Sequence, residues 1–347
     1  MIYFDVTKAG RSGHRSGLLR VSARLRESLG AAATGVLWDE GWRDAEKLER
    51  VNPAAGDWLL TAEVFSEAER PGFGEFLRSG RVRTAAIFHD AIPLKFPQIT
   101  WPQSVARHPG YLKMLAGFDR VWAVSEASRA ELAGFWQWQG LAQTPPVGVL
   151  ALGADFSGAA RVTRPAAPAA SRPRLLCVGI LEPRKNQSLL LDVCADLWAE
   201  GLDFKLHLVG RVNPHFGRPI AARIKALRKK FPHLHHHGAA GDAELAALYA
   251  TARASVFPTL AEGCGLPLLE SLWQGVPCVC SDLPVLRENA DGGGCLPVAV
   301  NDRAAWKDAL RRVLTDEALA ARLARESGAR PLPTWAGAAQ SLREVLA

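Results

Sequence analysis

A strand, a glycine-rich loop and a helix follow one another over residues 254–274, and this segment constrains the fold most. The apolar run 254–259 ends in a turn, which predicts a buried strand. Pro267 opens the next apolar run, where proline suits the first turn of a helix. Such a loop presents free backbone N–H groups and the positive end of a helix dipole to an anion. Two carboxylates, Glu262 and Glu270, flank it and can accept hydrogen bonds from hydroxyl groups.

Short apolar strands alternate with longer helical stretches throughout the chain, which is typical of α/β architecture. The pattern predicts strands at 2–6, 58–61, 84–89, 120–124 and 147–151, then at 174–179, 205–209, 254–257 and 276–281. The clearest helices are predicted at 18–29 and 126–138. Residues 157–173 are rich in Ala, Pro, Ser and Arg without apolar periodicity, which predicts a linker. Two α/β halves joined in this way make a cleft, and ligands of such sheets bind at the carboxyl ends of strands.

The length of 347 residues suits two domains, and a hydrophobic content of 48% is enough for two cores. The N-terminus enters a strand-like run directly, without the charged start and apolar core of a signal peptide. No apolar run approaches the roughly 18–20 residues needed to span a bilayer. We therefore expect a cytoplasmic protein, peripheral at most at the inner membrane face. The six cysteines form no C-x-x-C pair, which favours buried thiols in a reducing compartment.

The net charge of +7 is concentrated in residues 211–237, which contain seven cations and no acid: Arg211, Arg218, Arg223, Lys225, Arg228, Lys229 and Lys230. The favoured interpretation is a solvated helix face. The alternative is contact with an anionic membrane or a lipid-diphosphate acceptor. No recognised nucleic-acid module accompanies the charge, so nucleic acid is not an expected partner. His233, His235, His236 and His237 stand on alternating strand faces and cannot all converge on one ion, so no metal site is expected.

The string Phe-Pro-Thr-x-x-Glu-Gly-x-Gly-Leu-Pro-x-x-Glu at 257–270, followed by Gly-Val-Pro-Cys-Val at 275–279, resembles the Glu-x7-Glu motif of retaining family-4 (group 1) glycosyltransferases. The two glutamates alone would fit many doubly wound proteins, whereas the full string is far more specific. Segments 16–20, 88–93, 122–126 and 178–186 are similar to further family motifs.

The resemblance implies an α/β protein of the GT-B fold, with two Rossmann-like domains whose parallel sheets face a central cleft. Residues 1–156 would form the N-terminal acceptor-binding domain and 157–173 the linker. Residues 174–330 would form the nucleotide-sugar donor domain, and 331–347 a C-terminal helix packing back on the N-domain.

The resemblance also implies the roles of individual residues. Glu262 would orient the transferred sugar and Glu270 the ribose, while Arg184 and Lys185 would neutralise the leaving diphosphate. His89 would contact the transferred sugar or the developing charge. The catalytic residues are thus expected to be His89, Glu262 and Lys185, and the donor-binding residues Gly17, Arg184, Lys185, Gly263, Cys264, Gly265, Leu266 and Glu270. Two positions depart from the family pattern: Ile180 stands where many relatives carry a cation, and Cys264 where an aromatic residue is commoner.

The implied function is transfer of a hexose-like sugar from a nucleotide-diphosphate sugar to a hydroxyl acceptor, with retention of configuration and without metal or cofactor. The expected setting is bacterial polysaccharide or glycoconjugate synthesis, with a glycan or lipid-linked acceptor. The motifs leave open the sugar, the base, the acceptor, the linkage and the oligomeric state. The alternatives are a GT-B sugar-nucleotide epimerase and a non-catalytic nucleotide-sugar binding protein. The joint presence of Lys185, Glu262 and Glu270 argues against the second.

Overall fold

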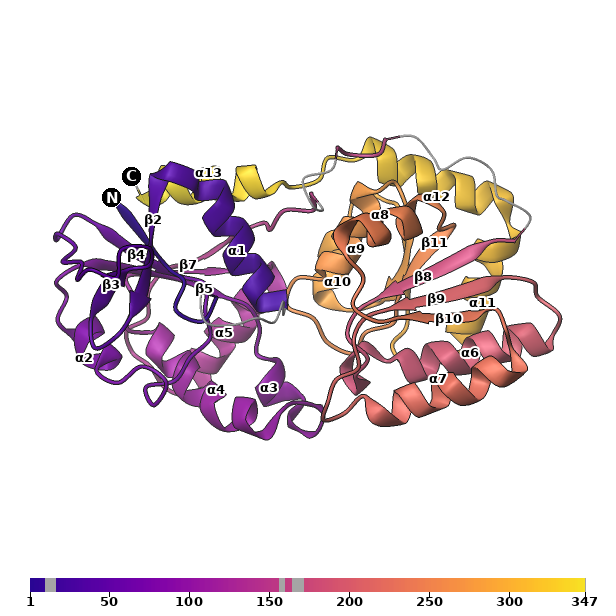
Figure 1. Ribbon diagram of the computed structural model, residues 1–347, viewed down its shortest axis with the longest axis horizontal. Helices are drawn as coiled ribbons and strands as arrows, with labels where there is room; N and C mark the ends of the chain where they lie inside the picture. Colours follow the sequence, from indigo (N-terminus) through magenta and orange to yellow (C-terminus); the bar gives the residue numbers. More distant parts are fainter. Residues whose placement is uncertain (10–16, 156–159, 164–171, 347) are drawn as a thin grey trace. The chain divides into compact units, whose positions relative to one another are not determined.

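The computed structural model describes residues 1–9, 17–155, 160–163 and 172–346. The chain divides into two compact units, which we call the N-terminal unit (Met1–Gly153 with Pro333–Ala347) and the C-terminal unit (Ala154–Leu332) (Figure 1). The sequence places the domain boundaries after 156, 173 and 330, whereas these units divide after Gly153 and Leu332, and the separate linker stays a prediction. Of the expected linker 157–173, residues 157–159 and 164–171 lie outside the described residues.

The N-terminal unit contains a seven-stranded sheet in the order β3-β2-β1-β4-β5-β6-β7. Its strands are β1 (Ile2–Asp5), β2 (Ala33–Trp38), β3 (Trp42–Asp44), β4 (Trp58–Thr61), β5 (Arg83–Phe88), β6 (Arg120–Ala123) and β7 (Val147–Val149). The expected parallel sheet is confirmed, and it carries one antiparallel edge strand, because all neighbours are parallel except β2 and β3. Only residues 39–41 join β2 to β3, and a parallel crossover needs a dozen residues or more.

The C-terminal unit contains a six-stranded, wholly parallel sheet in the order β10-β9-β8-β11-β12-β13. Its strands are β8 (Arg174–Val178), β9 (Lys205–Val209), β10 (Leu234–His237), β11 (Ala254–Phe257), β12 (Cys278–Ser281) and β13 (Cys295–Val298). β11 and β12 are buried along their whole length, which explains why their sequences are nearly continuous apolar runs.

Helices cover both sheets. The N-terminal unit has α1 (Gly17–Leu29), α2 (Phe73–Arg78), α3 (Ile92–Lys95), α4 (Pro102–Leu115), α5 (Glu126–Trp138) and α13 (Trp335–Leu346). The C-terminal unit has α6 (Gln187–Ala199), α7 (Arg218–Lys230), α8 (Asp242–Ala250), α9 (Leu266–Trp273), α10 (Pro284–Ala290), α11 (Arg303–Thr315) and α12 (Glu317–Ala329). The last helix, α13, lies beside the first, α1 (Figure 1). None of the helices in the described part of the chain is long and apolar enough to cross a membrane.

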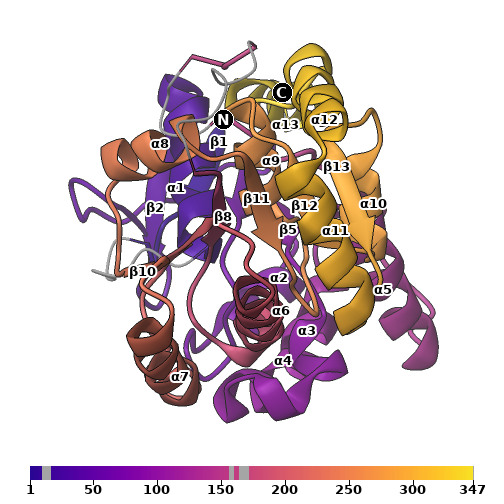
Figure 2. The same ribbon diagram turned by 90° about the vertical axis from the view of Figure 1, so that its right-hand side faces the viewer.

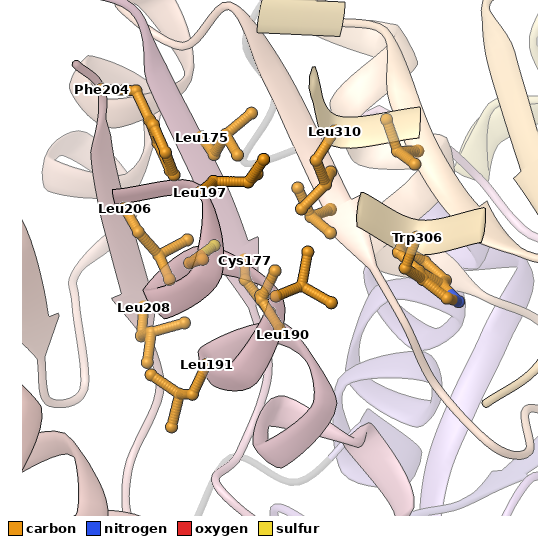
Figure 3. Packing of buried hydrophobic residues seen from close by; sticks show 14 of the residues in the cluster. Leu175, Cys177, Leu190, Leu191, Leu197, Phe204, Leu206, Leu208, Trp306 and Leu310 are labelled. Atoms are coloured by element: carbon orange, nitrogen blue, oxygen red, sulfur yellow. The ribbon is translucent and has the colours of Figure 1, made fainter. Parts of the chain in front are cut away.

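The core of the C-terminal unit lies between its sheet and helices α6, α7 and α11. Figure 3 shows Leu190 and Leu191 of α6 directed at the side chains of β8 and β9, with Trp306 and Leu310 entering from α11. On the other face of the sheet, α8 contributes Tyr249 to a smaller cluster. Figure 2 shows α7 at the outer side of the unit beside β10.

The order of the strands reverses once in each sheet. From β8 the chain first adds strands on one side, β9 and β10, and then crosses to the other side to form β11. From β1 it adds β2 and β3, and then crosses to β4. Ligands of open α/β sheets bind in the crevice that forms outside the carboxyl ends of strands at such a reversal. In this chain the strands at the reversal are β8 and β11 in one sheet, and β1 and β4 in the other.

Candidate functional site

The loops that follow β8 and β11 are joined by hydrogen bonds at the reversal point of the C-terminal sheet. The loop after β8 forms a short 3-10 helix, η3 (Pro183–Lys185). Within the loop after β11, Leu260 donates its backbone N–H to the carbonyl oxygen of Arg184 at 2.8 Å. Oγ1 of Thr259 lies 3.1 Å from the same oxygen. These contacts bring the Arg184–Lys185 pair to Glu262, which is 77 residues further along the chain than Lys185.

Glu262 is the centre of this site. Its Oε1 accepts hydrogen bonds from Nζ of Lys185 at 2.6 Å, from Nη1 of Arg184 at 3.0 Å and from the hydroxyl of Thr259 at 2.8 Å. The side chain is only 9% exposed. Burial raises the pKa of Glu262, but the charges of Lys185 and Arg184 and these hydrogen bonds outweigh burial and hold the pKa below its ordinary value. The carboxylate is therefore ionised at neutral pH.

Lys185 is also buried, and its Nζ lies 4.8 Å from the centroid of the Phe257 ring. Burial lowers the pKa of Lys185, and the neighbouring Glu262 carboxylate offsets part of this effect. The sequence assigned Lys185 and Arg184 to a diphosphate, whereas the structure places both on Glu262. A bound diphosphate would share or replace these contacts, and the assignment stays a prediction.

Two polar residues of this site were missed by the sequence analysis. Glu182 accepts hydrogen bonds from Nε and Nη2 of Arg184 at 3.1 and 2.9 Å, so Arg184 lies between two carboxylates. The other oxygen of Glu182 accepts from Nδ2 of Asn213 at 2.9 Å, which ties the loop after β9 to the site. The acid two positions before Arg184 was a signal that could have been used. Nothing in the sequence around Asn213 marks it.

The glycine loop has the expected form. Gly265 precedes α9 with a φ of +82°, a left-handed conformation that favours glycine, and Pro267 lies in the first turn of α9 as predicted. Nδ2 of Asn289, on α10, donates to the carbonyl oxygen of Cys264. The predicted loop residues Gly263 to Leu266 thus lead directly into α9, which also carries the buried Glu270.

The other two predicted residues belong to the N-terminal unit. His89 follows β5 and is buried, and its Nε2 donates to the carbonyl oxygen of Ala62 at 2.8 Å. Burial lowers the pKa of His89, so the ring is neutral at pH 7. Gly17 is the first residue of α1, and a Cβ placed there would meet nothing within 4 Å. Close packing among the described residues therefore does not explain a glycine at this position. Residues 10–16, which precede it, lie outside the described residues, and the donor-binding role of Gly17 stays a prediction.

The remaining clusters singled out in the sequence are separate from this site. His207 of β9 stacks on His235 and on His237, with ring centroids 4.6 and 5.2 Å apart. Within the part of the chain that the structure describes, no group of three or more His, Cys, Asp or Glu residues could hold a metal ion. On α7, Arg223 is paired with Asp192, whereas Arg228, Lys229 and Lys230 are exposed. Contact of this helix with an anionic membrane stays a prediction.

Residues 172–316 match the family model described as Glycosyl transferases group 1. The serotype-specific mannosyltransferase WbdA of Escherichia coli is 30% identical over 247 residues, which make up 67% of this chain and 29% of that protein. The chain thus spans less than a third of the length of this curated relative.

Two solved structures resemble almost the whole chain. Sucrose-phosphate synthase from Thermosynechococcus elongatus superimposes with a TM-score of 0.74 at 18% identity, covering 99% of this chain and 97% of that chain. HepE of Anabaena, solved in complex with UDP and glucose, gives a TM-score of 0.74 at 15% identity, covering 99% and 98%. These likenesses identify the fold as GT-B, as the sequence predicted.

We expect Glu262→Gln to lower the free energy of unfolding by about 3–5 kcal/mol, because it leaves the buried Lys185 cation without a charged partner. Urea unfolding measures this loss. Asp308→Asn is the matched control, since Asp308 is 65% exposed and lies 3.7 Å from Arg312 on α11. Its effect should stay within about 0.5 kcal/mol. Equal effects of the two substitutions would contradict the central place given to Glu262.

Gly265→Ala should destabilise the C-terminal unit by about 1–3 kcal/mol, through the left-handed backbone and a clash. A Cβ at this position would lie 2.6 Å from Cδ2 of Leu286. Gly241→Ala is the control, because Gly241 has a φ of −73° and nothing lies within 4 Å of its added Cβ. Thermal unfolding compares the two variants. An unchanged melting temperature for Gly265→Ala would show that the loop can adopt another backbone conformation.

Proposed function

The chain belongs to the group 1 glycosyltransferases by its residues 172–316, and we propose on this basis that it transfers a sugar from a nucleotide-diphosphate donor to a hydroxyl group of a glycan or lipid-linked acceptor. The reaction proposed is retaining and independent of metal. The anomeric carbon loses its bond to the diphosphate oxygen and gains one to the acceptor oxygen on the same face. The acceptor's hydroxyl proton leaves with the nucleoside diphosphate.

The observation that supports this proposal best is the meeting of Lys185, Arg184 and Glu262 at the reversal point of the C-terminal sheet. Two fixed cations beside a glycine loop suit a diphosphate leaving group, because they stabilise the charge that develops on it. Glu262 holds both cations in place and would itself accept a hydroxyl of the sugar. Glu270, buried on α9, would accept a ribose hydroxyl.

In this reaction His89 would act as an uncharged hydrogen-bond acceptor. The Nε2–H group of His89 donates to the carbonyl oxygen of Ala62. Nδ1 is therefore the nitrogen that can accept a hydrogen bond from a sugar hydroxyl. A sugar-nucleotide epimerase or a non-catalytic binding protein is a weaker candidate, because the curated relative is named a mannosyltransferase. For the same reason mannose is the first sugar to test, in a role within bacterial polysaccharide synthesis.

The direct experiment is a thermal-shift screen of UDP, GDP, dTDP and ADP, followed by the sugar nucleotides of the base that binds. A ligand at 100 times its dissociation constant should stabilise the protein by about 2.7 kcal/mol. Transfer is then measured as acceptor glycosylation in the presence of a chelator. Release of nucleotide with epimerised free sugar and no glycosylated acceptor would instead favour the epimerase, and loss of transfer on chelation would contradict a metal-independent reaction.

Lys185→Met should reduce kcat by about a hundredfold or more, because removing one donor that stabilises the charge of a transition state has effects of this size. Methionine preserves the length of the side chain in its buried place. The control is Arg161→Met, since Arg161 donates to carbonyl oxygens of Ser327 and Arg330, remote in sequence from both loops. Turnover in the control should stay within about threefold of the wild type. Similar turnover in both variants would remove Lys185 from the reaction.

Glu270→Ala should weaken binding of the free nucleoside diphosphate by about 1–3 kcal/mol, because the ribose hydroxyls lose their acceptor. Calorimetry measures this without any transfer. The control replaces Arg228, Lys229 and Lys230 together by Gln on the exposed end of α7, and nucleotide affinity should survive. An unchanged affinity in Glu270→Ala, or a collapse in the folded triple variant, would mean that the nucleotide is placed wrongly.

A further inference from the structure

The N-terminal unit has a cavity of its own at the reversal point of its sheet. It has a volume of about 510 Å³ and opens at the carboxyl ends of β1 and β4. Its charged lining residues are Lys8, Glu63, Glu69, Arg70 and Arg107. Ala62 also lines it, and its carbonyl oxygen is the one that accepts a hydrogen bond from His89. The cavity therefore occupies in this unit the place that the Glu262 site occupies in the other.

The inner charges of the cavity are satisfied by the protein itself. Glu63 accepts the backbone N–H groups of Lys8 and Ala9 at 2.7 to 2.9 Å and is paired with Arg70. Arg70 is also paired with Asp5 at 2.5 Å. These three charged side chains are at most 1% exposed. Burial, with the Asp5 carboxylate as the next cause, raises the pKa of Glu63 to about 7. The Asp5–Arg70–Glu63 network thus shapes the wall without offering a charge to a ligand.

The outer charges form a row that does reach solvent. Glu69 accepts from Nζ of Lys8 at 2.6 Å and from Nη1 of Arg107 at 3.1 Å, and each of the three side chains is about one-third exposed. The backbone N–H of Ser66 donates to the other oxygen of Glu69 at 2.8 Å, which fixes the carboxylate between the two cations. The hydroxyl of Ser66 and Nη1 of Arg107 also donate to this oxygen at 3.1 and 3.3 Å, so a ligand hydroxyl that donates to Glu69 would displace one of these contacts while its oxygen accepts from the neighbouring cation.

We propose that this cavity binds an uncharged, hydroxyl-rich ligand through the row Lys8–Glu69–Arg107, and that Glu69 makes it select a neutral sugar over a phosphorylated one. Neighbouring sugar hydroxyls each donate and accept, so a pair of them matches a cation and a carboxylate at once. A phosphate monoester above its second pKa of about 6 offers acceptors only, and the negative charge of Glu69 would repel both it and inorganic phosphate. Identifying the ligand as the acceptor rests on the proposed transferase function.

The test uses the full chain and saturation-transfer NMR, which detects binding without transfer. The probes are the methyl glycosides of mannose, glucose, galactose and N-acetylglucosamine, with inorganic phosphate and mannose 6-phosphate as anions. The wild type should bind at least one neutral glycoside and neither anion at this site. Glu69→Gln should weaken the glycoside about tenfold, the loss expected for a hydrogen bond to a charged group, and should let phosphate bind to the freed Lys8 and Arg107.

Two further variants make the result specific. Glu67→Gln is the matched control, because Glu67 is an exposed residue of the same loop that accepts from the N–H of Gly74 and does not line the cavity. It should behave as the wild type. Arg107→Gln should weaken the glycoside without gaining phosphate. Failure of every glycoside to bind, unchanged affinity in Glu69→Gln, or preference of the wild type for phosphate would each overturn the inference.

Calorimetry with the nucleoside diphosphates on the same samples separates this inference from the proposed function. A protein that binds nucleotide but no glycoside would refute the neutral-sugar site alone. A protein that binds a glycoside in a Glu69-dependent way but no nucleoside diphosphate would refute the proposed function and leave the cavity as a sugar-binding site.

Discussion

The reversal of strand order in each parallel sheet is the constraint on which the rest of this structure depends. At such a reversal, two adjacent strands are followed by loops that lead to opposite sides. These loops leave a crevice outside the carboxyl ends of the strands. In the C-terminal unit these loops carry the pair Arg184–Lys185 and the glutamate Glu262, far apart in sequence. In the N-terminal unit they carry Lys8 and Glu63. The order of the strands therefore determines where both candidate sites lie, and the side chains on the loops determine their chemistry.

Each reversal point is occupied by a buried network of charges. A buried ion pair adds little net stability, because the cost of removing two charges from water nearly cancels their attraction, although removing one partner is expensive. Lys185 illustrates this balance, since its pKa is lowered despite the contact with Glu262. Charges kept in this way are fixed in position before a ligand arrives. For a reaction in which negative charge develops on a leaving diphosphate, such preorganisation is the main contribution that a protein can make.

The sequence predicted what is local and missed what depends on distant partners. The central strands β8 and β11 are mostly apolar, and Pro267 after the glycine loop marks the start of α9. β13 was missed because Pro297 lies within it, and proline is tolerated there because β13 is an edge strand. At the site, the residues of the motif were identified, but the pairing of Arg184 with Glu182, and of Glu182 with Asn213, depends on how three loops meet. No spacing rule encodes such contacts.

The most direct test of the donor site is hydrogen–deuterium exchange with and without the nucleoside diphosphate that binds. Binding at the C-terminal reversal point should slow exchange in residues 179–186 and 258–270, because these loops supply the amides and side chains that would contact the ligand. Residues 218–230 of α7 should be unaffected. Protection confined to the two loops is the result that this account predicts. Tight binding with protection elsewhere, and none in these loops, would contradict it.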